Sequence, residues 1–215
     1  ERLSVSFKGA ESAVAVWLNG HYIGFGADSF TPSEFDLTDA LVPGENKLAA
    51  QVFKWSAGSW IEDQDFYRFS GLFRDVMLYR RPAVHVEDLR VTTDVSDDLA
   101  SAVVEVTAAL EGAGSVRARL DGVGDLTEAA DGRLAIRLDD PVLWSAERPH
   151  LYRLVIEALD EAGHVTEVIV QQVGVRRFGI EGGLLKINGE RVVFKGVNRH
   201  EFGLQGRVMS RERTE

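Results

Sequence analysis

The chain has 215 residues, with 24 Lys and Arg against 34 Asp and Glu, so its formal net charge at pH 7 is −10. Nucleic acid and anionic membranes are bound through clustered cations, so this balance argues against both as partners. The absence of Cys excludes disulfides, thiolate metal sites and a Cys nucleophile. No apolar run approaches the roughly 18 residues of a membrane-spanning helix. These numbers predict a soluble globular protein of one or two domains.

The N-terminal residues ERLSVSFKG carry no initiator Met and no targeting signal. We therefore expect the native N-terminus to lie upstream. The absence of both Cys and a visible targeting signal favours a cytoplasmic location.

Residues 3–79 predict short strands, because apolar and polar residues alternate or β-branched and aromatic types dominate. Asn19-Gly20 is a strong signal for a two-residue hairpin, since both central positions of such a turn need a positive φ. We expect residues 1–82 to form part of a jelly-roll-like β-sandwich with long loops. Its last residues, Arg80-Arg81-Pro82, have the character of a linker.

Residues 84–178 alternate more regularly, with one apolar and one polar face. Val104, Val106 and Ala108 share a face, and Val116, Ala118 and Leu120 do the same in the next segment. We expect six or seven half-buried antiparallel strands, which is the size and spacing of an immunoglobulin-like sandwich over residues 83–180. The Cys-Trp-Cys hallmark is absent, so only the architecture is predicted.

Residues 181–215 break the pattern again. A hairpin around Asn188-Gly189 precedes an apolar run, Val192 to Val197, and Ser210 is a candidate helix cap with Glu212 in the first turn. A continuous apolar strand is typical of a sheet buried on both faces. We expect this segment to be the start of a parallel (β/α)8 barrel, truncated after its first strand, and the chain to be a piece of a larger protein.

The segment WIEDQDFYRFSG, residues 60–71, places three carboxylates before an aromatic cluster. One interpretation is a solvated acidic loop whose aromatics plug the sandwich. The other takes Asp65 as a carboxylate that holds a hydroxyl or a monovalent cation, while an aromatic face covers apolar C–H surface. The spacing does not match a calcium-binding EF-hand loop.

His200 lies in the polar tetrad Asn198-Arg199-His200-Glu201, which directly follows the apolar run at residues 192–197. It is either structural or functional, and the functional interpretation gains support from its position, because barrel active sites gather at the C-terminal ends of strands. There it could donate to a ligand hydroxyl or titrate near neutrality. No second His or Cys lies at ligand spacing, which argues against a metal site. The other histidines, at positions 21, 85, 150 and 164, are scattered through hairpins and strands.

Several stretches together resemble the β-galactosidases of glycoside hydrolase family 2, in the same order, from about Leu3 to Met209. These stretches are WLNGHYIGFGADSFTPSEFDLT, GENKLAAQVFKWS, EDQDFYRFSGLFRDVML, LWSAERPHLYRLVIE, VGVRRFGI and FKGVNRHEF. The resemblance implies a jelly-roll sugar-binding domain, an immunoglobulin-like domain and a (β/α)8 barrel, with further β domains beyond.

The resemblance also implies site residues. Asp65 would ligate Na⁺ or K⁺ and contact the galactosyl 6-hydroxyl, and His200 would hydrogen-bond galactose and help stabilise the transition state. The acid-base and nucleophile glutamates and the ligands of the active-site Mg²⁺ would lie beyond Glu215, which leaves no catalytic residue in this chain. A peripheral magnesium site of the family is not expected, because Ala27 and Ala57 occupy its ligand positions.

We therefore expect part of a retaining β-galactosidase that hydrolyses terminal β-D-galactosyl bonds, with a galactoside as its substrate and a homo-oligomeric parent enzyme. The chain by itself should be inactive. Two alternatives stay open. The first is a carbohydrate-binding or assembly module with no enzymatic parent, and the second is a segment of a family 2 β-glucuronidase.

Overall fold

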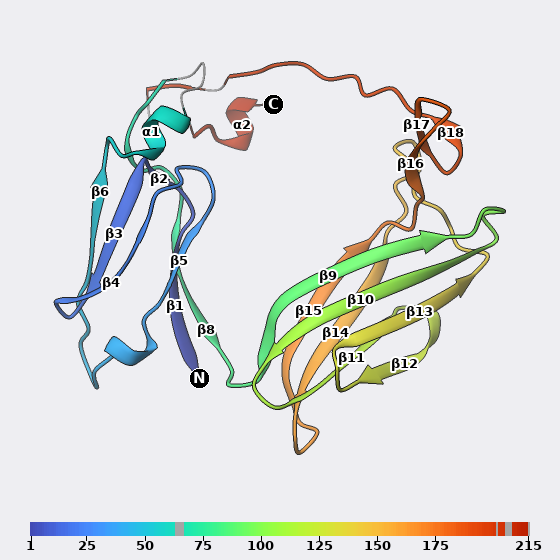
Figure 1. Ribbon diagram of the computed structural model, residues 1–215, viewed down its shortest axis with the longest axis horizontal. Helices are drawn as coiled ribbons and strands as arrows, with labels where there is room; N and C mark the ends of the chain where they lie inside the picture. Colours follow the sequence, from blue (N-terminus) through green and yellow to red (C-terminus); the bar gives the residue numbers. More distant parts are fainter. Residues whose placement is uncertain (63–66, 201, 205–207, 215) are drawn as a thin grey trace. The chain divides into compact units, whose positions relative to one another are not determined.

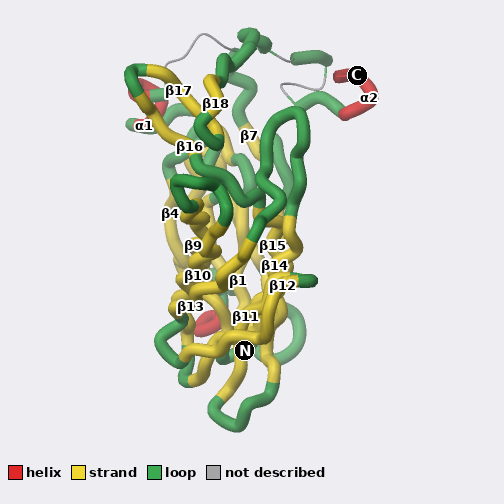
Figure 2. The backbone as a smooth tube through the Cα atoms, turned by 90° about the vertical axis from the view of Figure 1, so that its right-hand side faces the viewer, coloured by secondary structure: helices red, strands yellow, loops and turns green. Residues whose placement is uncertain are grey.

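The computed structural model describes residues 1–62, 67–200, 202–204 and 208–214. The chain divides into two compact units. Unit 1 comprises Glu1–Arg81 and Val197–Glu215, and unit 2 comprises Pro82–Gly196. Strands and loops make up nearly all of the chain, and helix is confined to short segments (Figure 2). The expected mainly β class is therefore confirmed.

Unit 1 contains two three-stranded antiparallel sheets (Figure 1). One has the order β5-β1-β8, from Ser33–Asp36, Arg2–Phe7 and Val76–Arg81. The other has the order β4-β3-β6, from His21–Gly26, Ala13–Leu18 and Leu48–Phe53. The short strands β2, Ala10–Glu11, and β7, Gly71–Leu72, pair with each other.

The two sheets of unit 1 enclose a small apolar core. Its buried members are Val5, Phe7, Ala10, Val14, Val16, Leu18 and Leu37. Gly24 leaves room for the ring of Phe35, because a Cβ at Gly24 would lie 2.6 Å from a ring carbon. The predicted hairpin is confirmed, since Asn19 and Gly20 have φ of 54° and 83° and join β3 to β4.

The helical segments of unit 1 are all short. They are the 3₁₀ turn η1, Thr38–Ala40, and the α-helices α1, Gly58–Ile61, and α2, Arg211–Thr214. Helix α2 begins directly after Ser210, whose carbonyl accepts from the amides of Arg213 and Thr214. No helix within the described ranges is long and apolar enough to cross a membrane.

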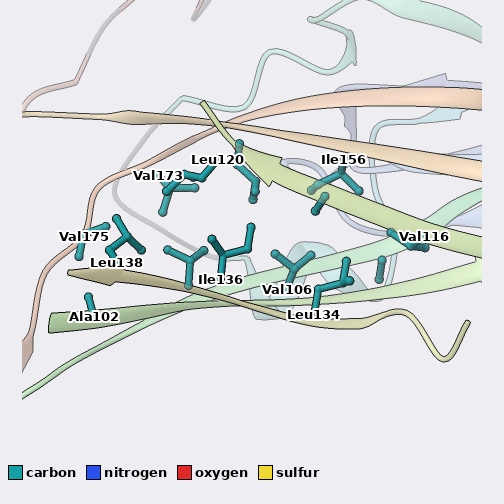
Figure 3. Close-up of a cluster of buried hydrophobic side chains, with 14 of the residues drawn as sticks. Ala102, Val106, Val116, Leu120, Leu134, Ile136, Leu138, Ile156, Val173 and Val175 are labelled. Carbon is teal, nitrogen blue, oxygen red and sulfur yellow. The ribbon is translucent and has the colours of Figure 1, made fainter. Parts of the chain in front are cut away.

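Unit 2 is a sandwich of two antiparallel sheets. One has the order β13-β10-β9, from Arg133–Asp139, Ser101–Glu111 and His85–Val95. The other has the order β12-β11-β14-β15, from Val123–Ala129, Gly114–Leu120, Tyr152–Asp160 and Val165–Val173. Alternate side chains from the two sheets face each other to form the core, including Val106, Ile136, Leu120 and Ile156 (Figure 3). The predicted apolar faces of these strands are thus confirmed.

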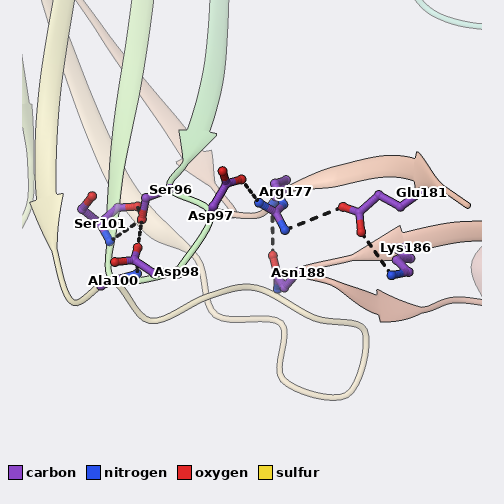
Figure 4. A network of polar contacts seen from close by, with 9 residues as sticks. All are labelled: Ser96, Asp97, Asp98, Ala100, Ser101, Arg177, Glu181, Lys186 and Asn188. Atoms are coloured by element: carbon purple, nitrogen blue, oxygen red, sulfur yellow. Dashed lines mark hydrogen bonds and ion pairs between the residues drawn. The ribbon is translucent and has the colours of Figure 1, made fainter.

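A three-stranded hairpin unit follows the sandwich. It consists of β16, Phe178–Glu181, β17, Leu184–Ile187, and β18, Glu190–Arg191. The predicted turn is confirmed, because Asn188 and Gly189 have φ of 51° and 82°. A network centred on Arg177 fastens this hairpin unit to the sandwich (Figure 4). The Arg177 guanidinium lies 2.7 Å from Asp97 and 3.6 Å from Glu181.

The strand expected over residues 192–197 is not formed. Strand β18 ends at Arg191, and residues 192–200 have no regular secondary structure. The side chains of Val193, Phe194 and Val197 are 64%, 68% and 91% exposed. A parallel strand gains its hydrogen bonds and its burial from neighbours on both sides, and the pairings within the described ranges are all antiparallel. The apolar run is therefore exposed in this structure.

Candidate functional site

Three loops of unit 1 contain or adjoin the described residues of the acidic-aromatic segment, 60–62 and 67–71. The first follows β4 and includes Ser29, the second follows β6 and carries α1, and the third leads into β7. The first two pack closely, because a Cβ at Gly58 would lie 2.9 Å from the carbonyl oxygen of Ala27. The three loops therefore form one cluster of backbone and polar side chains, which we call the loop cluster.

Glu62 joins the first loop to the second. One carboxylate oxygen accepts from the backbone amide of Ser29 at 2.9 Å, and the other accepts from the Ser29 hydroxyl. Ser29 is itself buried. Bonds from an amide and a hydroxyl to one carboxylate are charge-assisted and hold both partners in place. Glu62, the first of the three carboxylates in the acidic run, is thus a structural anchor.

Arg68 joins the second loop to the third. Its guanidinium donates to the carbonyl oxygen of Ser59 at 2.6 Å and to that of Glu62 at 3.4 Å. The same guanidinium lies 5.6 Å from the ring centre of Trp55, which is within the range of a cation–π contact. Arg68 therefore ties the residues before the acidic run to those after it.

Glu11 holds the end of the third loop. Its carboxylate accepts from the amide of Ser70 at 2.7 Å, and its backbone carbonyl accepts from the Ser70 hydroxyl at 3.3 Å. Ser70 has a φ of 66°, a conformation that costs free energy for residues other than Gly. The two hydrogen bonds from Ser70 to Glu11 stabilise it. Sequence patterns did not indicate Glu11, because a buried carboxylate on a two-residue strand has no periodic signature.

Asp28 orders the first loop. Its carboxylate accepts from the Thr31 hydroxyl and from the amides of Thr31 and Phe30, at 3.0 and 2.9 Å for the amides. These hydrogen bonds lower the pKa of Asp28, and the bond from the Thr31 hydroxyl contributes most. Arg74 donates to the Phe30 carbonyl at 2.7 Å, so the first loop is also connected to the chain beyond β7.

Aromatic side chains at the loop cluster reach solvent. Trp60 is 87% exposed, and Trp55 and Tyr67 are also largely exposed. The ring of Tyr67 lies 5.1 Å from that of Phe202 in an edge-to-face arrangement, and 6.1 Å from that of Phe69. Phe202 follows His200 closely in the chain. The structure therefore brings the two segments singled out in the sequence together within unit 1.

Of the two predicted site residues, the structure describes only one. Asp65 lies outside the described residues, and His200 is exposed. Among the described residues, no group of three or more His, Asp or Glu side chains is placed to hold a metal ion. Ala27 and Ala57, at the positions that the resemblance assigns to a peripheral magnesium site, have no side-chain oxygen. His85 is buried, with ring nitrogens 2.8 Å from the Pro82 carbonyl and 3.2 Å from Glu87.

Unit 2 has a groove that the sequence did not indicate. Its volume is about 400 Å³, and it runs between the edge strands β9 and β15. Its lining is mainly polar and includes Thr92, Thr93, Gln171, Gln172 and Arg176. The Arg176 guanidinium lies over the ring of Trp144 at 4.9 Å. No titratable pair suited to acid-base chemistry lines this groove.

Comparisons with known proteins agree with the fold and with the resemblance. A β-galactosidase of Halalkalibacterium halodurans is 45% identical over 98% of this chain, and one of Lactobacillus delbrueckii subsp. bulgaricus is 44% identical over 99%. The chain spans 22% of the length of each of these relatives. The crystal structure of an FMN-binding β-glucuronidase from Facaelibacterium prausnitzii L2-6 has a TM-score of 0.84, at 24% identity, over 99% of this chain and 36% of that one.

Two family matches cover most of the chain. Residues 1–82 match the sugar binding domain of glycosyl hydrolases family 2, and residues 84–176 match glycosyl hydrolases family 2. The junction between the matches lies next to the division between the two compact units, at Arg81 and Pro82. Sequence match, domain order and fold agree, and the chain belongs to glycosyl hydrolase family 2.

Proposed function

We propose that the whole protein is a retaining β-galactosidase that hydrolyses terminal β-D-galactosyl residues of lactose-type substrates. This chain supplies sugar and monovalent-cation contacts but not the two catalytic glutamates. The observation that carries the proposal is the 45% identity to a β-galactosidase across nearly the whole chain. The β-glucuronidase structures, at 24% identity, support the fold alone.

The deciding experiment expresses the whole reading frame and compares hydrolysis of p-nitrophenyl β-D-galactoside with that of the β-D-glucuronide. A site built to hydrogen-bond the galactosyl 6-hydroxyl should prefer the galactoside in kcat/KM by a factor on the order of 10⁴. The first sugar released should be the β anomer. Preference for the glucuronide would instead favour the alternative family 2 activity.

We further propose that the isolated chain is inactive. A retaining glycosidase needs two carboxyl groups about 5–5.5 Å apart across the scissile bond. The carboxylates of Glu62 and Glu11 hold backbone amides, which is a structural use. Cleavage of the chromogenic galactoside by the purified chain above the uncatalysed rate would contradict this. Measurable galactose affinity of the chain, by calorimetry, would favour an independent binding module.

Asp65 is proposed to ligate Na⁺ or K⁺ and to orient the sugar 6-hydroxyl in the whole protein. Asp65→Asn keeps the shape of the side chain but removes the charge. Cation activation should therefore be lost, and kcat/KM should fall by a factor that corresponds to about 1–3 kcal/mol of transition-state stabilisation. A 6-deoxygalactoside should lose much less on this substitution, because both changes remove one shared interaction. Asp39→Asn, which removes a charge from exposed η1, serves as the control. Unchanged sodium activation in Asp65→Asn rejects the role.

His200 is proposed to hydrogen-bond the galactose and to stabilise the transition state. In the whole protein, His200→Ala should lower kcat and kcat/KM together by about 10²-fold, as expected for a group that acts in the transition state. A rise in KM alone would assign His200 to ground-state binding.

The whole protein is also proposed to hold an active-site Mg²⁺ with ligands outside this chain, so a chelator should inactivate it.

Residues 181–215 are proposed to begin a (β/α)8 barrel in the whole protein, where Val192 to Val197 would form the first strand. The exposed apolar side chains of this run support the proposal, because partners on both faces would bury them. Amides of residues 192–197 should exchange at least about 10³-fold more slowly in the whole protein than in the chain alone. Equal exchange would contradict it.

We also propose that the whole protein is a cytoplasmic homo-oligomer. Light scattering tests the oligomeric state, and cell fractionation tests the location.

A further inference from the structure

Strand β15, Val165–Val173, lies at one edge of the four-stranded sheet of unit 2. Within the described ranges it pairs with β14 alone, so its other side has no neighbouring strand. The backbone amides and carbonyls on such a side can pair with another chain. Proteins usually protect an edge of this kind with Lys, Pro, charged side chains or a covering loop. The composition of β15 therefore decides whether this edge can bind.

The composition of β15 does not protect the edge. Its sequence, VTEVIVQQV, contains no Lys, Arg or Pro. The one charged residue, Glu167, accepts at 2.8 Å from the backbone amide of Val86 on β9, so its carboxylate faces the opposite sheet. Val168 and Val170 are 55% and 48% exposed. An exposed apolar edge strand of this composition is a predicted site of strand pairing.

The other edge strands of unit 2 differ from β15, because they all carry charged side chains. These are Glu87, Asp88, Arg90 and Asp94 in β9, Glu128 in β12, and Arg133, Arg137 and Asp139 in β13. In unit 1, the edge strands β4 and β6 also lack Asp, Glu, Lys and Arg, but each has only six residues. Strand β4 contains two glycines, which weaken a strand, and β6 lies between Lys47 and Lys54, which act against pairing between chains.

The backbone bonds of β14 determine which residues of β15 point to the free edge. The amide of Asp121, which follows β11, donates to the Arg153 carbonyl at 2.9 Å, so Arg153 points toward β11. Successive residues of a strand point to opposite neighbours, so Leu154 points toward β15 and bonds Gln171, which lies opposite it. Every second residue of β15 then points away from β14. The residues whose amides and carbonyls point to the free edge are Val168, Val170 and Gln172.

This edge is complementary to a second copy of itself. If two copies of β15 pair antiparallel about a twofold axis at Ile169, all nine residues of the strand overlap. Val168 then lies opposite the partner's Val170, and the symmetry forms this β-branched pair twice. Glu167 lies opposite the partner's Gln171, so no two like charges face each other. Cross-strand pairs of this kind stabilise a sheet, and a twofold contact closes without leaving a further open edge.

We infer that the free edge of β15 binds the same edge of a second copy of this chain, in the register centred on Ile169. The sheet β12-β11-β14-β15 would thereby continue across two copies. This inference deepens the proposed homo-oligomer, on which it rests, by naming a contact surface. The pairing itself is a property of this chain and needs no enzymatic activity for its test.

The first test measures self-association of the chain by sedimentation velocity. The chain should dimerise reversibly, with half of it dimeric at a concentration on the order of 10–100 µM, as for a small interface. The double variant Val168→Lys/Val170→Lys places Lys opposite Lys in the proposed register and should raise this concentration at least about tenfold. Ala135→Lys, at an exposed position of edge strand β13, is the matched control and should leave it unchanged.

Two results of this test would overturn the inference. One is a chain that stays monomeric at about 1 mM, a concentration at which even weak interfaces form. The other is a dimer that the double variant leaves intact, because the contact would then lie on another surface. Val168 and Val170 are both exposed, so circular dichroism should show the same β content in the double variant as in the unmodified chain.

The second test identifies the register by disulfide cross-linking and does not depend on the Lys variants. The chain has no Cys, so each introduced Cys reports on one position. In the proposed register the Cα atoms of Val168 and the partner's Val170 are about 5.5 Å apart, which a disulfide spans. A mixture of Val168→Cys and Val170→Cys should therefore form a mixed disulfide dimer in glutathione disulfide.

Either cysteine variant alone should cross-link several-fold less than the mixture. Two copies of Val168 lie diagonally across the proposed pair, about 7–8 Å apart, which is beyond the reach of a disulfide. Ala135→Cys, mixed with either variant, is the control and should not cross-link. Equal cross-linking in a single variant, or in the control, would overturn the proposed register.

Cross-linking in the whole protein separates this inference from the proposed homo-oligomer. If light scattering finds an oligomer but the mixed cysteine variants do not cross-link, the inference fails and the homo-oligomer stands. If the whole protein is a monomer, the homo-oligomer proposal fails, and dimerisation of the chain still decides the pairing of β15.

Discussion

The two units use β-sheet in different ways. The sandwich of unit 2 has strands of seven to eleven residues whose alternate side chains are buried, as in Arg133–Asp139. Its core contains 15 buried apolar residues among those described, against seven in unit 1. Unit 1 has strands of two to six residues, and apolar side chains of β8, such as Leu78, are exposed. Unit 2 therefore has the larger apolar core, and unit 1 has many exposed apolar side chains.

The difference supports the proposed sugar and cation contacts in unit 1. Exposed apolar surface is typical of sites that contact a ligand or another part of a protein. The loops of unit 1 are held by charged side chains, such as Glu11, Glu62 and Arg68, rather than by a large core. Polar anchors fix a backbone locally, so loops of this kind can carry specific contacts on a small scaffold.

The sharpest test of this comparison is hydrogen exchange along the whole chain. Amides in the central strands β10 and β14 of unit 2 should exchange at least about 10²-fold more slowly than those of β3 in unit 1, because they open only with the larger core. Residues 192–200 should exchange fastest. Protection in residues 185–200 that exceeds that of residues 102–156 would contradict the comparison.

Leu→Ala substitutions in the two cores should lower the free energy of unfolding by unequal amounts. Leu154 in unit 2 and Leu18 in unit 1 are both buried. Leu154→Ala should lower the free energy of unfolding by about 4 kcal/mol and Leu18→Ala by about 2 kcal/mol, because the smaller core can relax around the lost atoms. Denaturant titration of each variant gives these values. Half-exposed Leu48 is the control, and Leu48→Ala should cost less than about 1 kcal/mol. Equal costs at positions 18 and 154 would mean that the cores are equally rigid.

The two hairpin asparagines offer a smaller, matched comparison. The side-chain amide of Asn19 forms hydrogen bonds with Lys47, Ala40 and Asn46. The side-chain amide of Asn188 forms hydrogen bonds with Arg177 and Trp144. Asn→Gly keeps the positive φ and removes only the amide. Three hydrogen bonds are lost at position 19 and two at position 188, so we expect the free energy of unfolding to fall by about 1.5 kcal/mol and about 1 kcal/mol, respectively. Thermal unfolding measures both. A larger loss at position 188 would indicate that the Arg177 network depends on the turn.

The smallest effect is a pH dependence in unit 1. Burial raises the pKa of Asp36, but hydrogen bonds from Thr38 and the pairing with Arg2 outweigh it and lower the pKa from 3.8 to about 2. A lowered folded-state pKa stabilises the fold above the unfolded value, and this contribution is lost as the pH falls from about 4 to about 2.

Because the Asp36 side chain is 37% exposed, solvent screening limits its contribution to about 1 kcal/mol. Asp36→Asn should therefore destabilise the chain at pH 7 and match the unmodified chain near pH 2. A difference that persists at pH 2 would assign the effect to packing. Unfolding curves of both proteins across this pH range make the comparison.

Much of this architecture was predictable from local sequence. The alternation around Val104 and Val106 identified the buried faces of unit 2, because a strand has a side-chain period of two. The Asn-Gly pairs identified two hairpins, because only such residues readily adopt the positive φ that the turn requires. The candidate site was predictable only as a stretch of unusual composition, which singled out the segment after Trp60 but not the buried Glu11 that holds its end.

Tertiary structure decided the rest. The apolar run at Val192 was predicted as a strand, yet strand formation needs a continuous row of partners, and the described residues offer it one backbone hydrogen bond that the structure shows, from the Val192 amide to the Leu185 carbonyl. Glu11 and Ser70 are 59 residues apart, and their contact exists only because β2 and β7 pair. Local sequence determined where the backbone turns and which face of a strand is apolar, because these depend on a residue and its neighbours. Which distant side chains meet depends on how the sheets pack, and only the folded chain determines that.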